Sequence, residues 1–215
     1  MSLITLVLLV LILFKIVATT PIAPTVPYAK PRAAEVSPVP VCSLKTDIML
    51  VIDRSSTMTE TDYGKIKMEW AKEAATAFVS AIEAMQNIDS LRIGVDSFGA
   101  QGNDGTGTRP ADRNSTLDSP LTSDFTALKT AISQVHYIQS GTCIECGLRI
   151  ANDQFITSTA DKKVIILISD GMANTVWNGT NNGALQAAID AANSGRTTYG
   201  IRISVLVSEI RQPIK

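Results

Sequence analysis

Two short, unbroken apolar runs limit the possible folds of this 215-residue chain more than any other feature. Residues 48–52 read IMLVI and residues 164–168 read VIILI, and an aspartate, Asp53 or Asp170, follows each run within two residues. Apolar runs that do not alternate with polar residues are typical of strands buried on both faces, as in a parallel sheet. The chain therefore predicts a sheet whose central strands end at acidic residues.

Helical patterns separate these strands. Apolar residues at helical spacing predict a long amphipathic helix over residues 63–88, with Ile66, Trp70 and Phe78 on its buried stripe and Lys67 off it. Further helices are expected near residues 122–135, 145–155 and 182–193, the last ending at Gly195. Two more strands are expected at residues 91–98, which alternate with period two, and at residues 201–207, with an irregular loop over residues 99–114.

This alternation of strands and helices indicates right-handed βαβ units. We therefore expect a doubly wound α/β fold with a mostly parallel sheet and helices on both faces. Ligands of such sheets lie at the carboxyl ends of the strands, where Asp53 and Asp170 are predicted.

The N-terminal segment differs from the rest. Residues 3–14 are apolar apart from Thr5 and are followed by Lys15, which suits either the core of a signal peptide or a short transmembrane anchor, so both remain open for residues 1–18. Residues 19–46 are rich in proline and predict a semi-rigid linker. The globular domain is expected over residues 47–215, outside the cytoplasm, as a secreted or membrane-anchored protein.

Composition and charge exclude some partners. Apolar residues make up 45% of the chain and charged residues 18%, so a core can form. The net charge is -1, and the basic side chains form no cluster. Nothing would therefore concentrate a phosphate backbone, and nucleic acid is not an expected partner.

A run of oxygen-bearing side chains follows the first predicted strand. Asp53, Ser55 and Thr57 place one carboxylate and two hydroxyls on a tight turn. Ligand sets made only of oxygen suit a hard divalent cation, and magnesium needs few protein ligands because it keeps several waters. The sequence thus favours Mg²⁺, or Mn²⁺, at this turn.

These motifs together resemble the von Willebrand factor type A domain over about residues 47–207. The resemblance rests on D-x-S-x-T after IMLVI, the helix KIKMEWAKEAATAFVSAI, SGT at Thr142, and IILISDG at Asp170. It implies a metal-ion-dependent adhesion site whose open coordination position takes an Asp or Glu carboxylate of a protein partner. The implied metal ligands are Asp53, Ser55, Thr57, Thr142 and Asp170.

Three departures from the family pattern stand out. Thr57 replaces a commoner serine, and Ser56 stands where glycine is frequent. The chain also ends at Lys215, soon after the last predicted strand, which leaves open whether the family's C-terminal helix is lacking.

Residues close to the implied site in sequence are expected to form its rim and contact a partner. These residues are Arg54, Met58, Asn174 and Trp177. Cys143 and Cys146 directly follow Thr142, and a local disulfide and two free thiols both remain open for them.

The leading functional hypothesis is a non-enzymatic binding module for adhesion or surface assembly. One alternative is a phosphohydrolase of the haloacid-dehalogenase type, which also has a strand ending in D-x-D-x-T, but Ser55 here offers no carboxylate for general acid–base chemistry. Another alternative is a domain of the same fold with an inactive metal site.

Overall fold

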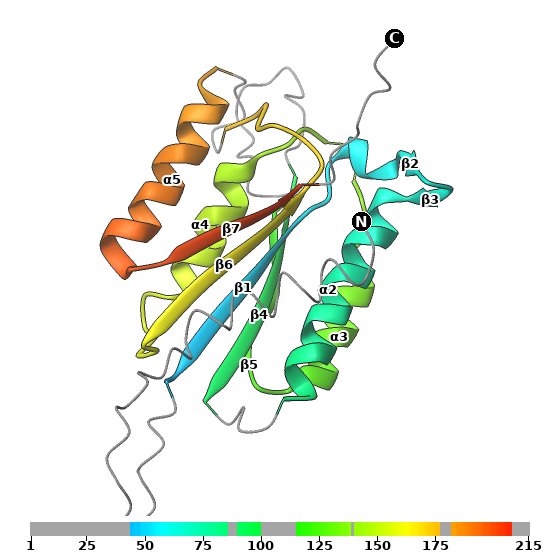
Figure 1. The fold of residues 1–215 in the computed structure, drawn as a ribbon. Helices are drawn as coiled ribbons and strands as arrows, with labels where there is room; N and C mark the ends of the chain where they lie inside the picture. The colour runs from blue at the N-terminus through cyan, green and yellow to red at the C-terminus, as the bar shows by residue number, and fades with distance from the viewer. Residues whose placement is uncertain (1–43, 86–89, 100–114, 139, 177–181, 208–215) are drawn as a thin grey trace, which may run out of the picture. The chain divides into compact units, whose positions relative to one another are not determined.

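A five-stranded sheet organises the computed structural model, which describes residues 44–85, 90–99, 115–138, 140–176 and 182–207 (Figure 1). Its spatial order is β5-β4-β1-β6-β7. Strands β4, β1, β6 and β7 run parallel, and β5 runs antiparallel at one edge. The predicted mostly parallel sheet is therefore confirmed. The strand bounds are β1 (Thr46–Asp53), β4 (Leu91–Phe98), β5 (Thr116–Thr122), β6 (Lys162–Ser169) and β7 (Arg202–Val207).

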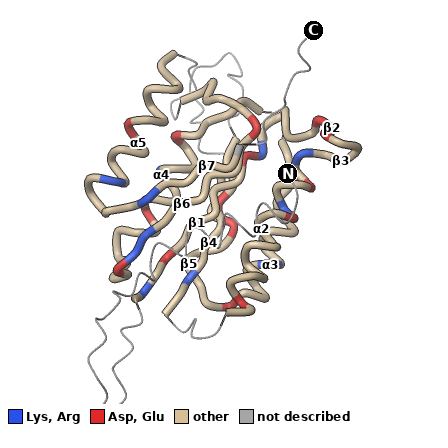
Figure 2. The backbone as a smooth tube through the Cα atoms, viewed as in Figure 1, with Lys and Arg blue, Asp and Glu red and all other residues tan. Residues whose placement is uncertain are grey.

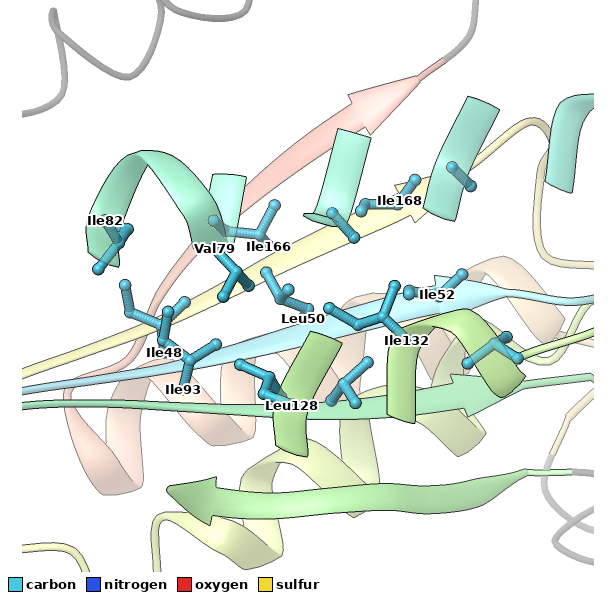
Figure 3. Close-up of a cluster of buried hydrophobic side chains, with 14 of the residues drawn as sticks. Ile48, Leu50, Ile52, Val79, Ile82, Ile93, Leu128, Ile132, Ile166 and Ile168 are labelled. Atoms are coloured by element: carbon cyan, nitrogen blue, oxygen red, sulfur yellow. The ribbon is translucent and has the colours of Figure 1, made fainter. Parts of the chain in front are cut away.

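Two helices cover each face of this sheet, as predicted. Helices α2 (Lys67–Glu83) and α3 (Phe125–Gln134) pack on one face, where Leu50 of β1 meets Val79 and Leu128 (Figure 3). Helices α4 (Ile144–Gln154) and α5 (Ala184–Tyr199) cover the other face. Successive residues of a strand point to opposite faces, so an unbroken apolar run buries both sides of β1.

The segment before α2 differs from the prediction of one long helix. Residues after β1 form a 3₁₀ helix, η1 (Ser56–Thr59), and then a hairpin of β2 (Thr61–Asp62) and β3 (Lys65–Ile66). Because the hairpin holds Ile66 extended, the buried stripe of α2 starts at Met68 and is rotated from the predicted one. Lys67 is thereby turned into the protein, while Trp70 stays half exposed, with its Nε1 donating to the Asp62 carbonyl (3.1 Å).

Strand β5 and the end of α5 also depart from expectation. No strand was expected over residues 116–122, a segment that contains Pro120 and few apolar residues. An edge strand tolerates proline, which has no backbone donor, and β5 pairs with β4 through an irregular register. Helix α5 continues past Gly195 and ends at Gly200, where φ is 68°. Gly195 is needed inside the helix because a Cβ there would lie 2.4 Å from Asn152 Oδ1 of α4.

The predicted N-terminal segment and most of the linker lie outside the described residues, as do residues 208–215 after β7. Among the described elements no helix follows β7, and no described helix is both long and apolar enough to cross a membrane.

The connections place the point where the chain changes direction across the sheet at the carboxyl ends of β1 and β6. These strands are neighbours, but the chain leaves β1 towards α2 on one face and leaves β6 towards α5 on the other (Figure 1). Loops that diverge from adjacent strands leave a crevice between them, which is where open α/β sheets bind ligands. Asp53 ends β1, and Asp170 follows β6 at this point.

Candidate metal centre

The turn after β1 closes around the buried carboxylate of Asp53. Its Oδ1 accepts from the backbone N–H of Ser55 (2.8 Å), and its Oδ2 accepts from Ser169 Oγ (2.6 Å), at the end of β6. Asp53 and Ser55 are both buried. Burial raises the pKa of Asp53, the hydrogen bonds from Ser169 and Ser55 oppose this, and the charge of Asp170 adds to it.

The loop after β6 joins the same network. Asp170 Oδ1 accepts from Thr57 Oγ1 (2.9 Å), and Thr57 Oγ1 lies 3.2 Å from Ser55 Oγ. Asp53, Ser55, Thr57 and Asp170 thus form one hydrogen-bonded chain, although Thr57 and Asp170 are 113 residues apart. The Asp170 side chain is 2% exposed, and Thr57 is exposed. The structure brings these four predicted ligands together.

The loop before α4, which carries Thr142, is hydrogen-bonded to both of these loops. The N–H of Thr142 donates to Asn174 Oδ1 (2.7 Å), and its carbonyl accepts from the N–H of Asn174 (3.0 Å). Ser140 is tied to Ser56 of the first loop, because its N–H donates to Ser56 Oγ (2.8 Å) and its carbonyl accepts from that hydroxyl (2.9 Å). Gly141 allows the segment after β6 to pack closely against this loop, since a Cβ there would lie 2.5 Å from Thr175 Oγ1.

Thr142 is not the cap of α4. The N-cap position is held by Cys143, which makes no side-chain capping hydrogen bond. A disulfide joins Cys143 to Cys146, with their Cα atoms 5.2 Å apart and both residues buried. This bond fixes the first turn of α4 directly after Thr142.

The donor set of these residues fits a divalent cation. Within the described ranges no three His, Cys, Asp or Glu side chains gather closely enough to hold a metal ion, so hydroxyls would have to complete the ligand set. The set of two carboxylates and three hydroxyls is made only of oxygen, as Mg²⁺ and Mn²⁺ prefer. Burial, with the charge of Asp170 added to it, raises the pKa of Asp53, and a cation beside the two carboxylates would offset both effects.

The predicted rim residues differ in their burial and contacts. Met58 is buried in the core under α2, because η1 turns its side chain inward, so its assignment to the rim was wrong. Asn174 is exposed, but its side chain holds the Thr142 loop. Arg54 is half-buried, and burial lowers its pKa while the charge of Asp118 opposes this. Trp177 lies outside the described residues.

Two residues of this network were not predicted from sequence. Ser169 directly precedes Asp170, and its position in the strand was the only signal for its role. Lys67 is 4% exposed, and its ammonium donates to Asp170 Oδ2 (2.7 Å) and to Glu60 Oε2. Burial lowers the pKa of Lys67, but hydrogen bonds and charges from Asp170 and Glu60 prevail and raise it. No local pattern marks Lys67, because its partner lies 103 residues away.

Charges elsewhere on the domain are mixed. Acidic and basic residues are interspersed along the described part of the chain (Figure 2).

Comparisons with known proteins agree with the fold. Residues 48–173 match the family model of the von Willebrand factor type A domain. No curated protein matches the chain. Among solved structures, the conserved hypothetical protein BatB of Bacteroides thetaiotaomicron shares 22% identity at a TM-score of 0.54, over 75% of this chain and 66% of that one.

Two pilus proteins are also similar. The vWF domain of the type V pili tip protein Mfa5 of Porphyromonas gingivalis shares 27% identity at a TM-score of 0.50, over 62% of this chain and 40% of that one. The pilus adhesin SpaC of Lactobacillus rhamnosus GG shares 18% identity at a TM-score of 0.59, over 76% of this chain and 24% of that one. The chain thus spans less than half of either pilus structure. The likeness to BatB and SpaC bears on the fold alone.

Proposed function

The chain belongs to the von Willebrand factor type A domain family, and from this premise we propose that it is a metal-dependent binding module for adhesion or surface assembly. Its site binds Mg²⁺ or Mn²⁺ and, through the metal, an Asp or Glu carboxylate of a protein partner. The observation that carries this proposal is the hydrogen-bonded chain from Asp53 through Ser55 and Thr57 to Asp170. Such a chain preorganises oxygen ligands from two loops at one point.

Each residue of the site has a distinct part in this proposal. Ser55, Thr57 and Thr142 contribute neutral hydroxyl oxygens, and Asp53 and Asp170 contribute negative charge, directly or through water. Ser169 holds the Asp53 carboxylate in place by its hydrogen bond. A bound cation supplies the positive charge that attracts a partner's carboxylate. Thr57 is the exposed member of the set, so the partner approaches from its side.

The compartment and the lack of catalysis are parts of the same proposal. Mfa5 is a type V pili tip protein, which supports a role outside the cytoplasm. Residues 1–18, as a signal peptide or an anchor, would deliver or hold the domain there. No enzymatic role is proposed, since Ser55 offers no carboxylate for proton transfer.

Calorimetric titration of Mg²⁺ and Mn²⁺ into the full chain in detergent tests this function. We expect binding in the wild type and a ten- to hundredfold loss of affinity in Asp53→Ala and in Asp170→Ala, because each carboxylate contributes charge and orients its neighbours. Asp124→Ala is the matched control, since Asp124 is a carboxylate that caps α3 by accepting from the N–H of Ala127 (2.9 Å).

Thr142 tests the third loop in the same titration. Thr142→Val deletes the hydroxyl and should weaken metal binding, whereas Thr142→Ser should match the wild type.

Unchanged titration in both aspartate variants would contradict the site. Metal-dependent hydrolysis of a phosphomonoester that is lost in Asp53→Asn would instead favour the phosphohydrolase.

A further inference from the structure

A buried ammonium, that of Lys67, is paired with Asp170, the second carboxylate of the proposed metal site. Lys67 is the first residue of α2, and its N–H donates to the Glu60 carbonyl (2.9 Å), which fixes the start of the helix beside the site. Its ammonium lies 2.7 Å from Asp170 Oδ2, and both side chains are almost wholly buried. A lysine at the N-terminus of a helix meets the positive end of the helix dipole, so helix stability alone does not favour this position.

Both carboxylate oxygens of Asp170 accept a hydrogen bond in this arrangement. Oδ1 accepts from the Thr57 hydroxyl, and Oδ2 accepts from Lys67. The ammonium thus gives Asp170 the positive charge that a buried carboxylate requires, and removing one partner of such a pair leaves an uncompensated charge. A divalent cation that approached Asp170 would meet this ammonium in a poorly solvated site, where like charges repel strongly.

We propose that Lys67 is a built-in cation of the site that keeps Asp170 paired in the metal-free domain and lowers the affinity of the site for Mg²⁺ or Mn²⁺. This inference rests on the proposed function. Glu60 also takes part, because its carboxylate is exposed and already accepts a hydrogen bond from the Lys67 ammonium. When the metal binds, the Lys67 ammonium stays paired with Glu60, and its hydrogen bond to Asp170 breaks. A partner's carboxylate adds negative charge at the site, so metal and partner bind together more readily than the metal alone.

Titration of Mn²⁺ and Mg²⁺ alone into the full chain, without a partner, tests this role of Lys67. Lys67→Met keeps the unbranched stem and deletes the charge. We expect it to bind Mn²⁺ at least tenfold more tightly than the wild type. Its melting temperature without metal should be lower, because Asp170 is left unpaired, and saturating Mn²⁺ should restore it.

Three further variants separate charge from packing. Lys67→Arg keeps the charge and should bind Mn²⁺ with wild-type affinity. Lys65→Met removes a lysine of the preceding β2–β3 hairpin, which pairs with Glu73 instead, and it should leave the affinity unchanged. Glu60→Gln removes one of the two carboxylates that pair with Lys67, so the ammonium is held by Asp170 alone and Mn²⁺ binding should weaken. This last variant decides the matter if Lys67→Met does not fold.

The outcomes distinguish this inference from the proposed function. If the wild type binds Mn²⁺ and Lys67→Met binds it equally or more weakly, Lys67 does not oppose the metal and only this inference fails. If neither protein binds Mn²⁺ or Mg²⁺, the metal site itself is wrong and both fail. Binding that appears only in Lys67→Met supports the inference in its strongest form, with the ammonium alone excluding the metal.

Discussion

Asp96 lies in β4 with no exposed surface, and neither of its carboxylate oxygens has a hydrogen-bond partner in the part of the chain that the structure describes. Burial raises its pKa well above the usual range, and the charge of Asp118 adds to this. An unpaired carboxylate in such a place is held as the neutral acid. Asp96 therefore makes the stability of the domain depend on pH.

The sign of this dependence follows from the raised pKa. The unfolded chain releases the Asp96 proton near pH 4, whereas the folded protein retains it to higher pH, so the free energy of unfolding falls as the pH rises through this interval. Asp96→Asn cannot ionise. We expect it to raise the free energy of unfolding at pH 7 by about 1–3 kcal/mol, and the gain should shrink towards pH 4.

Urea unfolding of both proteins at a series of pH values between 4 and 8 measures this difference. Asp62→Asn is the control, because Asp62 is a partly exposed carboxylate of a strand. A variant that is less stable than the wild type at pH 7, with the same pH profile, would show that Asp96 is charged and stabilised in a way that its surroundings do not reveal.

The sequence predicted the site residues whose roles are visible in the local sequence pattern. Asp53, Ser55 and Thr57 share one turn, and Asp170 ends a strand, so their types and positions were informative. Asp96 was not, because the period-two pattern of residues 91–98 suggests one solvated face, whereas β4 is buried on both faces apart from Arg92. Lys67 was missed for another reason: a lysine off the apolar stripe of a helix is ordinarily solvated, and only the tertiary contact with Asp170 buries it.

The β2–β3 hairpin shows how one short element redirects the chain. Asp62 pairs with Lys65, which leaves Tyr63 and Gly64 as a two-residue turn with φ values of 48° and 79°. Positive φ at both positions is the requirement of a type I′ turn, which favours Asn-Gly. Tyr63 is 88% exposed, so its ring gains little from burial to offset its backbone strain.

Replacing this tyrosine should stabilise the domain. Asn tolerates the left-handed region better than Tyr, so we expect Tyr63→Asn to raise the free energy of unfolding by about 1 kcal/mol. Chemical denaturation measures it, and Tyr137→Asn, at another exposed tyrosine whose φ is not positive, should give no such gain. If Tyr63→Asn lowers stability, the tyrosine ring makes contacts that outweigh its strain.

Among the helices and strands, the sequence predicted those with a clear apolar pattern. The apolar runs of β1 and β6 and the helical spacing of Phe125, Leu128 and Ile132 in α3 were sufficient signals. The β2–β3 hairpin was missed because its strands have two residues each, and β5 because backbone pairing with β4, not side-chain pattern, makes it a strand. The face of α2 was misjudged because the hairpin, not the helix, sets where the first turn begins.

The candidate metal centre joins three loops that belong to both halves of the sheet. Ser56 links the loop after β1 to that of Ser140, and Asn174 links the Thr142 loop to the segment after β6. A ligand held by all three loops binds the folded domain and not the unfolded chain, so it stabilises the whole unit.

Metal should therefore raise the melting temperature of the domain. At a metal concentration about 100 times the dissociation constant, the gain is about 2.7 kcal/mol. For a domain of this size we expect a rise of roughly 5–10 °C in thermal unfolding. EDTA should reverse the rise, and Asp170→Ala should not show it. An equal rise in Asp170→Ala would place the stabilising metal elsewhere.

The two edges of the sheet differ in a way that limits how copies of the domain could associate. β5 is irregular in its pairing, carries Pro120 and so lacks one backbone donor, whereas β7 is the opposite edge strand and contains no proline. Growth of a sheet from molecule to molecule requires two receptive edges on each copy. A domain with one receptive edge can pair once, edge to edge about a twofold axis, which permits a closed dimer and stops a fibre after its first step.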